Sequence, residues 1–140
     1  MKNAYIFDSV RTPRGKGKST GALNTIRPVE LASFPLKALI NRNQLDPKLI
    51  EDVVYGCVTQ VAEQGANIAK AAALEAKLAD TVGGVSVNRF CGSGLEAVNQ
   101  ASSRIMAGFE KLIVAGGVES MSRTPIGSDG GALAADPRLA

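Results

Sequence analysis

The 140-residue chain contains no histidine and no tryptophan, and its aromatic residues make up only 4% of the sequence. So few aromatic rings disfavour the base stacking on which single-stranded nucleic-acid binding depends. An excess of one charge is also lacking, because 16 basic residues face 13 acidic ones and leave a formal charge of +3. This weak, dispersed charge does not indicate a nucleic-acid surface, although it would not repel a phosphorylated ligand. We therefore expect no nucleic-acid partner.

Long apolar runs are missing as well. The run Tyr5–Phe7 is far too short for a signal peptide, and no later segment reaches the roughly 20 apolar residues of a membrane-spanning helix. Cysteine is limited to Cys57 and Cys91, so a disulfide framework is not expected and a reducing compartment fits. The sequence therefore predicts a soluble, cytoplasmic protein without a membrane partner. Its length and its 45% apolar content are those of one compact unit with its own core.

Strand-like and helix-like apolar patterns alternate along the chain. The predicted strands cover residues 4–10, 53–58, 85–88 and 112–115. The predicted helices begin near residue 28 and cover residues 68–78 and 91–107. This βαβαβαβ order implies an α/β fold with a mostly parallel sheet and helices on both faces. Such sheets bind their ligands at the carboxyl ends of the strands.

Several helix boundaries carry their own signals. Pro35 removes a hydrogen bond from the interior of the first helix, which predicts a kink or a later start. Asp46 is a candidate cap for a short helical turn, and Asn67 is a candidate cap for the helix at 68–78. Gly108 is the expected end of the last helix.

Cys91 lies where the strand at 85–88 meets the following helix. The first amides of a helix have no intrahelical partner and its N-terminus carries a positive partial charge, so a thiol placed there is helped toward the thiolate. Gly92 and Gly94 are poor helix formers, which makes sense if a substrate or another backbone segment must come close. We interpret Cys91 as a nucleophile. Cys57 falls in a β-branched run, where a cysteine more often serves as a small buried hydrophobe.

Three stretches carry a resemblance to one family. The run from Val87 to Val98, Val-Asn-Arg-Phe-Cys-Gly-Ser-Gly-Leu-Glu-Ala-Val, resembles the acyl-enzyme signature of the thiolases, which include acetyl-CoA acetyltransferase and 3-ketoacyl-CoA thiolase. Residues 8–15 and 115–122 are similar to two further stretches of that family. The resemblance covers essentially the whole chain but only part of the family's length. It implies the N-terminal part of a duplicated αβαβα fold with strand order 3-2-1-4, an order that the apolar patterns do not give.

The resemblance also implies a division of the chain and a set of site residues. Residues 1–122 would form an incomplete thiolase-like N-terminal domain, and residues 123–140 would begin an inserted loop region. Cys91 would carry the acyl group. The residues expected to bind substrate or support the site are Asn88, Gly92, Gly94, Gly116, Gly117, Glu119, Met121 and Ser122. For the two glycines at 116 and 117, a plain turn is an equally good interpretation.

Coenzyme A is a substrate in the chemistry that the resemblance implies, and neither a permanently bound cofactor nor a metal is expected. The family takes a histidine base, a second catalytic cysteine and one oxyanion-hole amide from its C-terminal half, whereas this sequence has no histidine. The missing half is therefore an expected partner, and the chain alone is expected to be inactive. The amide of Cys91 is the oxyanion donor that these residues would supply.

Two other functions stay open. The first is another condensing enzyme of the thiolase superfamily, a ketoacyl synthase or a hydroxymethylglutaryl-CoA synthase, although residues 88–96 and 116–122 favour a thiolase. The second is a non-catalytic binding or assembly module, which the absence of histidine supports. The basic, glycine-rich residues 11–21 would suit a phosphate, but they lack the spacing of a P-loop and such segments are more often solvated connectors.

The helix predicted at 91–107 has small or apolar residues around most of its circumference, a pattern typical of a helix that is buried on all sides. A single sheet covers only one of these sides, and in thiolases the matching helix looks to lie between two sheets. We therefore expect the chain to associate. The expected partners are a second copy, in a homodimer or tetramer formed through the edge strand at 85–88, or the missing half.

Overall fold

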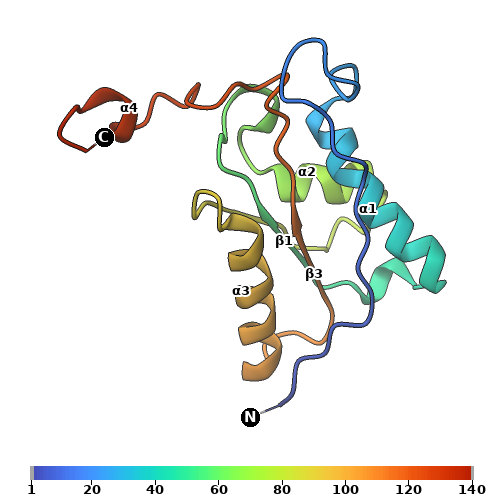
Figure 1. Cartoon of the computed structure of the whole chain (residues 1–140). Helices are drawn as coiled ribbons and strands as arrows, with labels where there is room; N and C mark the ends of the chain where they lie inside the picture. Colours follow the sequence, from blue (N-terminus) through green and yellow to red (C-terminus); the bar gives the residue numbers. More distant parts are fainter. Residues whose placement is uncertain (1, 140) are drawn as a thin grey trace.

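The computed structural model describes residues 2–139 and contains an α/β fold (Figure 1). Its helices are α1 (Pro28–Asn43), α2 (Ile68–Glu75), α3 (Ser93–Ala107) and α4 (Ala132–Ala135), with short 3-10 turns η1 (Pro47–Leu49) and η2 (Ala62–Gln64). Its strands are β1 (Asp52–Gly56), β2 (Val85–Val87) and β3 (Ile113–Gly117). The predicted fold class is confirmed. Among residues 2–139, no helix combines the length and the apolar character that a membrane crossing requires.

β1 is the central strand of a parallel sheet with the order β2-β1-β3. Val54 lies opposite Val85 on one side and opposite Ala115 on the other. All five residues of β1 are buried, as expected for a parallel strand that has neighbours at both edges and helices on both faces. Figure 1 shows α3 against one face of the sheet and α1 and α2 on the opposite side.

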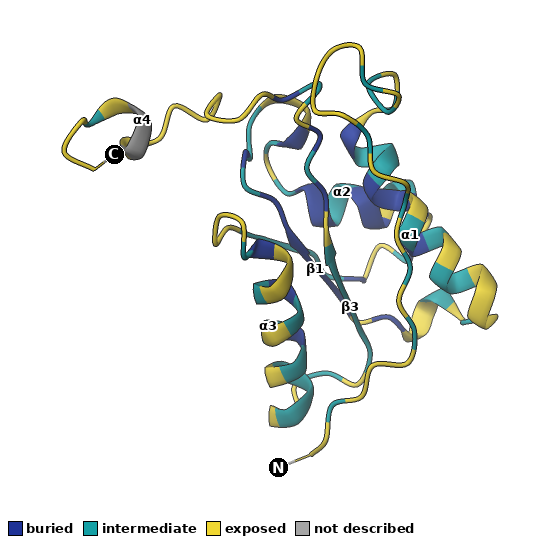
Figure 2. Cartoon of the chain, in the orientation of Figure 1, coloured by how far each residue is buried: buried dark blue, intermediate teal, exposed yellow. Residues whose placement is uncertain are grey.

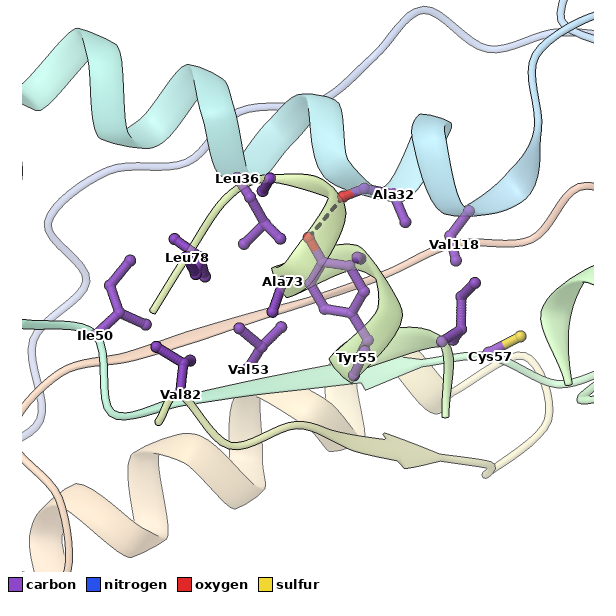
Figure 3. Close-up of a cluster of buried hydrophobic side chains, with 14 residues drawn as sticks. Ala32, Leu36, Ile50, Val53, Tyr55, Cys57, Ala73, Leu78, Val82 and Val118 are labelled. Atoms are coloured by element: carbon purple, nitrogen blue, oxygen red, sulfur yellow. Dashed lines mark hydrogen bonds between the residues drawn. The ribbon is translucent and has the colours of Figure 1, made fainter. Parts of the chain in front are cut away.

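Successive side chains of β1 point to opposite faces of the sheet, which creates two apolar clusters. On one face Val53 and Tyr55 pack against α1 and α2 (Figure 3). On the other face Val54 packs against Ala97 of α3. The Tyr55 hydroxyl donates a hydrogen bond to the carbonyl oxygen of Ala32 in α1 at 3.0 Å. Burial raises the pKa of Tyr55, so this phenol stays neutral inside the core.

The strand expected at residues 4–10 is not formed. This segment is extended and passes between β3 and α1 in the view of Figure 1, but it makes no ladder hydrogen bond. Tyr5, Ile6 and Phe7 are 70%, 79% and 89% exposed. Because β1 pairs directly with β3 and with β2, both of its edges are occupied and no place is left for another strand beside it. The implied strand order 3-2-1-4 is therefore wrong for residues 2–139.

Polar contacts hold this N-terminal segment to α1 instead of to the sheet. The Asp8 carboxylate accepts a hydrogen bond from the side-chain amide of Asn43 at 2.8 Å and pairs with Arg42 at 3.3 Å. The hydrogen bond from Asn43 is the main cause that lowers the pKa of Asp8. The segment is thus fixed at one point while its apolar side chains remain in solvent.

The predicted helix caps are confirmed. The side chain of Asp46 accepts from the amide of Lys48 at 3.0 Å, and that of Asn67 accepts from the amide of Lys70 at 3.2 Å. Each bond satisfies one of the amides that a helix start leaves without a partner. Gly108 ends α3 with a φ of 84°, in the left-handed region that glycine adopts readily.

Two other boundaries differ from the prediction. α1 continues through Pro35 to its end at Asn43, so the expected later start is wrong. α2 ends at Glu75 instead of near Leu78, because Lys77 takes a left-handed φ of 61° that a continuing helix does not allow.

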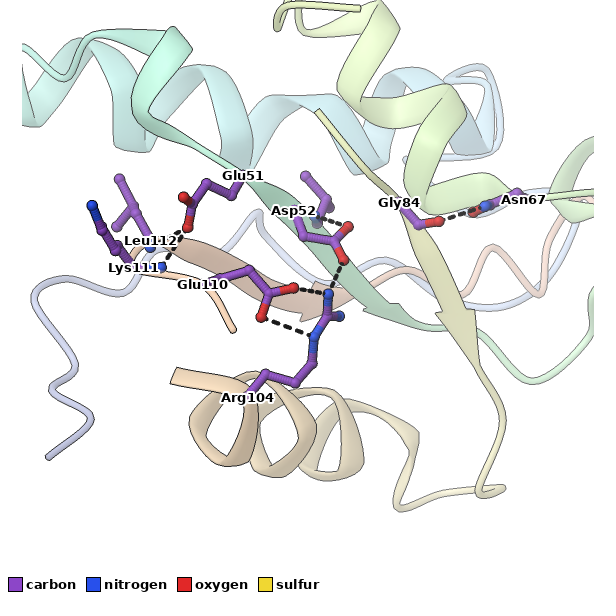
Figure 4. A network of polar contacts seen from close by, with 9 residues as sticks. Glu51, Asp52, Asn67, Gly84, Arg104, Glu110, Lys111 and Leu112 are labelled. Carbon is purple, nitrogen blue, oxygen red and sulfur yellow. Dashed lines mark hydrogen bonds and ion pairs between the residues drawn. The ribbon is translucent and has the colours of Figure 1, made fainter. Parts of the chain in front are cut away.

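Charged side chains fasten the amino ends of the strands (Figure 4). Arg104 of α3 pairs with Asp52 at the start of β1 at 2.6 Å, and also with Glu110 just before β3. The Glu51 carboxylate accepts from the backbone amide of Lys111, and this bond lowers the pKa of Glu51. Ion pairs and hydrogen bonds thus occupy the amino ends of β1 and β3. The candidate site lies at the opposite edge, where the predicted site residues follow the carboxyl ends of β2 and β3.

The sheet covers α3 on one side only (Figure 2). Ser93, Ala97 and Ala101 are buried, whereas Leu95 on the outer side is 68% exposed. The expectation that one sheet cannot bury this helix is therefore confirmed. Residues 125–139, which include α4, run away from the rest of the molecule (Figure 1).

Candidate active site

The six residues Asn88–Ser93, which we call the cysteine turn, connect β2 to α3. The side-chain oxygen of Asn88 accepts from the amide of Phe90 at 2.9 Å. The buried hydroxyl of Ser93 accepts from the amide of Arg89 at 2.9 Å and donates to the carbonyl oxygen of Phe90 at 2.6 Å. The turn is thus fixed from both ends by its own side chains.

Phe90, the residue directly before Cys91, has a φ of 48°. A side chain in this left-handed region costs about 1–2 kcal/mol compared with an ordinary conformation, so the turn stores backbone strain. Strained residues cluster at functional sites. They persist only where surrounding hydrogen bonds hold the backbone in the strained conformation. Here those bonds come from Asn88 and Ser93.

Cys91 is an exposed, free thiol. α3 begins at Ser93, two residues later than predicted, and Gly92 is its N-cap. Cys91 therefore lies just before the helix start and still close to the positive end of the helix dipole. A Cβ at Gly94 would meet no atom within 4 Å, so the approach to the first turn of α3 is open.

The first turn of α3 sits directly on the end of β1. A Cβ at Gly56 would lie 2.5 Å from the carbonyl carbon of Ser93 and 2.7 Å from the amide nitrogen of Gly94. A Cβ at Gly117 would lie 2.5 Å from the carbonyl oxygen of Gly56. Real Cβ atoms do not approach other atoms this closely, so Gly56 lets the end of β1 lie against the start of α3, and Gly117 lets the end of β3 lie against β1.

Glu119 serves as a link between segments. Its carboxylate accepts from the backbone amide of Val58 at 2.7 Å and from the side-chain amide of Gln64 at 2.7 Å. The sequence pattern did not single out Gln64, which lies in a polar loop beside Glu63 and Gly65 and resembles a solvated connector. The structure shows that Gln64 is fully buried.

The predicted site residues fall into two groups. Asn88, Cys91 and Gly92 belong to the cysteine turn, with Gly94 directly after it. The others line a cavity of about 1690 Å³ that lies between residues 3–17, α1, α3 and β3: Gly116, Gly117, Glu119, Met121 and Ser122. Cys91 does not line this cavity. The backbone contacts at Gly56 and the hydrogen bonds of Val58 connect the two groups.

Cys57 is buried at the end of β1. Burial, together with the nearby charge of Glu119, raises its pKa to about 12. A thiol in this state is neutral near pH 7 and does not act as a nucleophile. The structure thus supports the structural role that the sequence indicated for Cys57. Within residues 2–139, no three histidine, cysteine, aspartate or glutamate side chains gather as metal ligands would.

Comparison with known proteins identifies a family. The family model described as the thiolase N-terminal domain matches residues 4–135. The chain is 48% identical to a 3-ketoacyl-CoA thiolase of Shewanella denitrificans and 47% identical to one of Shewanella baltica, over 127 residues that make up 90% of this chain and 33% of each relative. Among solved structures it is similar to the Bacillus anthracis acetyl-CoA acetyltransferase, with a TM-score of 0.70 and 40% identity over 75% of this chain and 26% of that chain.

The chain therefore spans about a third of the length of the curated relatives that it matches. The matched residues include the cysteine turn and all three strands. Both the sequence relatives and the structural neighbour carry thiolase-type names, in agreement with the resemblance of the run Val87–Val98. On this evidence, the chain belongs to the thiolase family, within its N-terminal domain.

Proposed function

We propose that this chain is the N-terminal part of an acyl-CoA C-acyltransferase in which Cys91 carries the acyl group. The observation that carries the proposal is the free, exposed thiol of Cys91 on a strained turn directly before α3. Family membership supports the same chemistry, since the relatives are named 3-ketoacyl-CoA thiolase and acetyl-CoA acetyltransferase. These names favour a thiolase over a synthase of the same superfamily.

In the degradative direction, the Cys91 thiolate attacks the keto carbon of a 3-ketoacyl-CoA. The bond to the carbon between the keto group and the thioester breaks. That carbon keeps the electron pair and takes up a proton, which gives acetyl-CoA. The shortened acyl group stays on Cys91 as a thioester until the thiolate of free coenzyme A attacks it and releases the cysteine thiolate. The reverse sequence condenses two acyl-CoA molecules.

The remaining site residues act around this cysteine. Asn88 holds the turn, while Gly92 and Gly94 leave room for the substrate. The amide of Cys91, close to the helix start, would donate to the oxyanion that forms on the attacked carbonyl oxygen. The residues that would support the site from the end of β3 are Gly116, Gly117, Glu119, Met121 and Ser122.

A histidine base is not among these 140 residues, so another part of a longer thiolase would supply it together with the second oxyanion donor. Coenzyme A would bind only as a substrate, without a resident cofactor. Residues 1–122 would form the incomplete thiolase-like N-terminal domain, and residues 123–140 would begin the inserted loop region. Two free thiols support a reducing, cytoplasmic location.

The open edge of β2 supports a proposal about assembly. Among residues 2–139, β2 pairs with β1 at one edge only, and an unpaired strand edge is a template for another chain. We expect a second copy to pair there in a homodimer or tetramer, or the missing half of the protein to cover the outer side of α3. Sedimentation velocity measures the oligomeric state, and ANS fluorescence measures the exposed apolar surface. A monomer that does not bind the dye would contradict both arrangements.

A chimeric enzyme tests the catalytic proposal. This chain replaces the matching N-terminal third of the Shewanella denitrificans relative, whose 48% identity makes the shared interface compatible. We expect the chimera to cleave acetoacetyl-CoA in the presence of coenzyme A. The reaction is monitored through the loss of substrate absorbance. Cys91→Ser should reduce the rate by about a thousandfold or more, because it removes the nucleophile.

The matched control is Cys57→Ser, which changes the other thiol and should leave most of the activity in a chimera that folds. A folded chimera that has no activity, or one that keeps its rate with Cys91→Ser, would refute the assignment of Cys91.

A further inference from the structure

A buried hydrogen-bond network lies beside the cysteine turn. Gln64 is 0% exposed. Its side-chain nitrogen donates to the Glu119 carboxylate at 2.7 Å and to the carbonyl oxygen of Thr59 at 2.9 Å. Its side-chain oxygen accepts from the amide of Ser120 at 2.5 Å. Every polar atom of this glutamine therefore has a partner, which makes the network rigid.

Glu119 extends the network to Val58. One carboxylate oxygen accepts from Gln64 and the other from the backbone amide of Val58 at 2.7 Å. The network thereby joins three segments that lie far apart in the sequence: the residues after β1, the turn η2 and the residues after β3. The network therefore fixes the position of Val58, which follows the carboxyl end of β1.

Val58 in turn holds the cysteine turn. Its carbonyl oxygen accepts from the side-chain nitrogen of Asn88 at 3.1 Å, while the side-chain oxygen of Asn88 accepts from the amide of Phe90. Phe90 is the strained residue directly before Cys91. One continuous path of hydrogen bonds therefore leads from the buried Gln64 to the backbone that carries the thiol.

We infer that Gln64 and Glu119 are positioning residues for Cys91, which act on it through Val58 and Asn88. Neither is hydrogen-bonded to the thiol, but together they hold residue Val58, whose carbonyl oxygen anchors Asn88. Loss of the Gln64 donors leaves the Glu119 carboxylate without the partner that orients it. The hold of Glu119 on Val58 then weakens, and with it the anchor of Asn88 and of the strained turn. The inference rests on the proposed role of Cys91 as the nucleophile.

The test measures how fast iodoacetamide alkylates Cys91 in the native 140-residue chain, with each cysteine quantified by mass spectrometry. Gln64→Met keeps the side-chain volume and removes the hydrogen bonds. We expect it to slow Cys91 alkylation by about three- to tenfold. Cys57 should stay unmodified, which shows in the same sample that the core is folded.

A double-variant comparison separates positioning from general loosening. Asn88→Ala removes the last side chain of the path and should slow Cys91 to a similar extent. The double variant Gln64→Met/Asn88→Ala should be no slower than Asn88→Ala alone, because both changes interrupt one path. Arg104→Met, which breaks contacts at the opposite edge of the sheet, is the matched control and should leave the Cys91 rate within about twofold.

The outcomes are distinguishable. If Cys57 becomes reactive in Gln64→Met, the variant has unfolded, and Glu119→Gln, which keeps one acceptor oxygen, takes its place in the same comparison. Unchanged Cys91 alkylation in a folded variant, or effects of the two changes that multiply, would overturn the inference. If the chimera described above keeps its rate with Cys91→Ser, the proposed nucleophile fails, independently of the comparison between variants.

Discussion

Arg104 on α3 and Asp52 on β1 form an ion pair of 2.6 Å that joins the helix of the cysteine turn to the central strand. Asp52 is 7% exposed and Arg104 also pairs with Glu110. The pair and its second carboxylate hold the end of α3 that lies farthest from Cys91. The helix is thus fixed at one end by charge and at the other by backbone contact with Gly56.

Removal of this cation should destabilise the fold. Arg104→Met leaves two carboxylates without their partner in a part-buried place, and we expect the free energy of unfolding to fall by about 1–3 kcal/mol. Urea denaturation, monitored by circular dichroism, measures this free energy of unfolding. Arg138→Met is the control, because its ion pair with Asp136 is on the surface, where solvent screening makes the expected loss much smaller. Equal losses in both variants would contradict the role of Arg104.

Gly56 should tolerate no side chain. In Gly56→Ala the new Cβ would lie 2.5 Å from the backbone of Ser93, so α3 must move off the sheet, at a cost of about 2 kcal/mol or more. Gly94→Ala, two positions from the N-cap, meets no atom within 4 Å and should be neutral or stabilise by up to about 1 kcal/mol. The thermal unfolding midpoints of the two variants test this prediction. An unchanged midpoint in Gly56→Ala would show that the contact between Gly56 and Ser93 is not tight.

The two thiols should differ in reactivity. Cys91 is exposed and Cys57 is buried with a pKa raised to about 12, so at pH 8 iodoacetamide should modify Cys91 in the folded chain and leave Cys57 unmodified. Added urea should expose Cys57 and make the two rates similar. Equal labelling without urea would contradict the burial of Cys57.

Acid should weaken the fold. Hydrogen bonds from the Lys111 amide and from Arg123 lower the pKa of Glu51 and of Glu63 from their ordinary value of 4.5. Because the folded state favours the ionised carboxylates, their contribution is complete above that value and is lost as the pH falls through the lowered pKa of the folded state. The urea midpoint should therefore fall between about pH 5 and pH 3. Glu63→Gln should flatten this fall, whereas an unaltered slope would contradict it.

The 140-residue chain by itself should not turn over acetoacetyl-CoA. A positioned thiol without a histidine base and without a second oxyanion donor lacks contributions that are each worth about a hundredfold or more. Thiolysis is measured with purified chain and free coenzyme A, with the chimera described above as the positive control. Turnover that persists in the chain and disappears in Cys91→Ser would show that these residues contain a complete site.

The sequence predicts the strand-to-helix junction at Cys91, although it places the helix start two residues too early, because the determinants of the junction are local. Asn88, Cys91 and Ser93 lie within six residues of one another, and the caps at Asp46 and Asn67 act on amides two and three residues away. Such contacts follow from the order of residues alone. Even here the sequence does not indicate the strain at Phe90, since no local pattern predicts a left-handed φ at a phenylalanine.

The sequence does not predict features that depend on distant partners. Tyr5, Ile6 and Phe7 favour a strand, but this preference does not reveal that β1 and β3 pair directly and leave no place between them. Gln64 was missed for a similar reason, because its partners Glu119 and Ser120 lie 55 and 56 positions further along the chain. A buried glutamine in a polar loop has no periodic pattern that marks it.

The unpaired segment at residues 4–10 has a consequence for biosynthesis. Ribosomes synthesise this segment before any of the three strands, yet the sheet closes without it. Tyr5, Ile6 and Phe7 therefore stay in water from the start of translation until the rest of the protein or a partner covers them. Adjacent large apolar side chains on an extended backbone are what chaperones bind and what drives aggregation of nascent chains. We therefore expect these three side chains to promote aggregation of the nascent chain until they are covered.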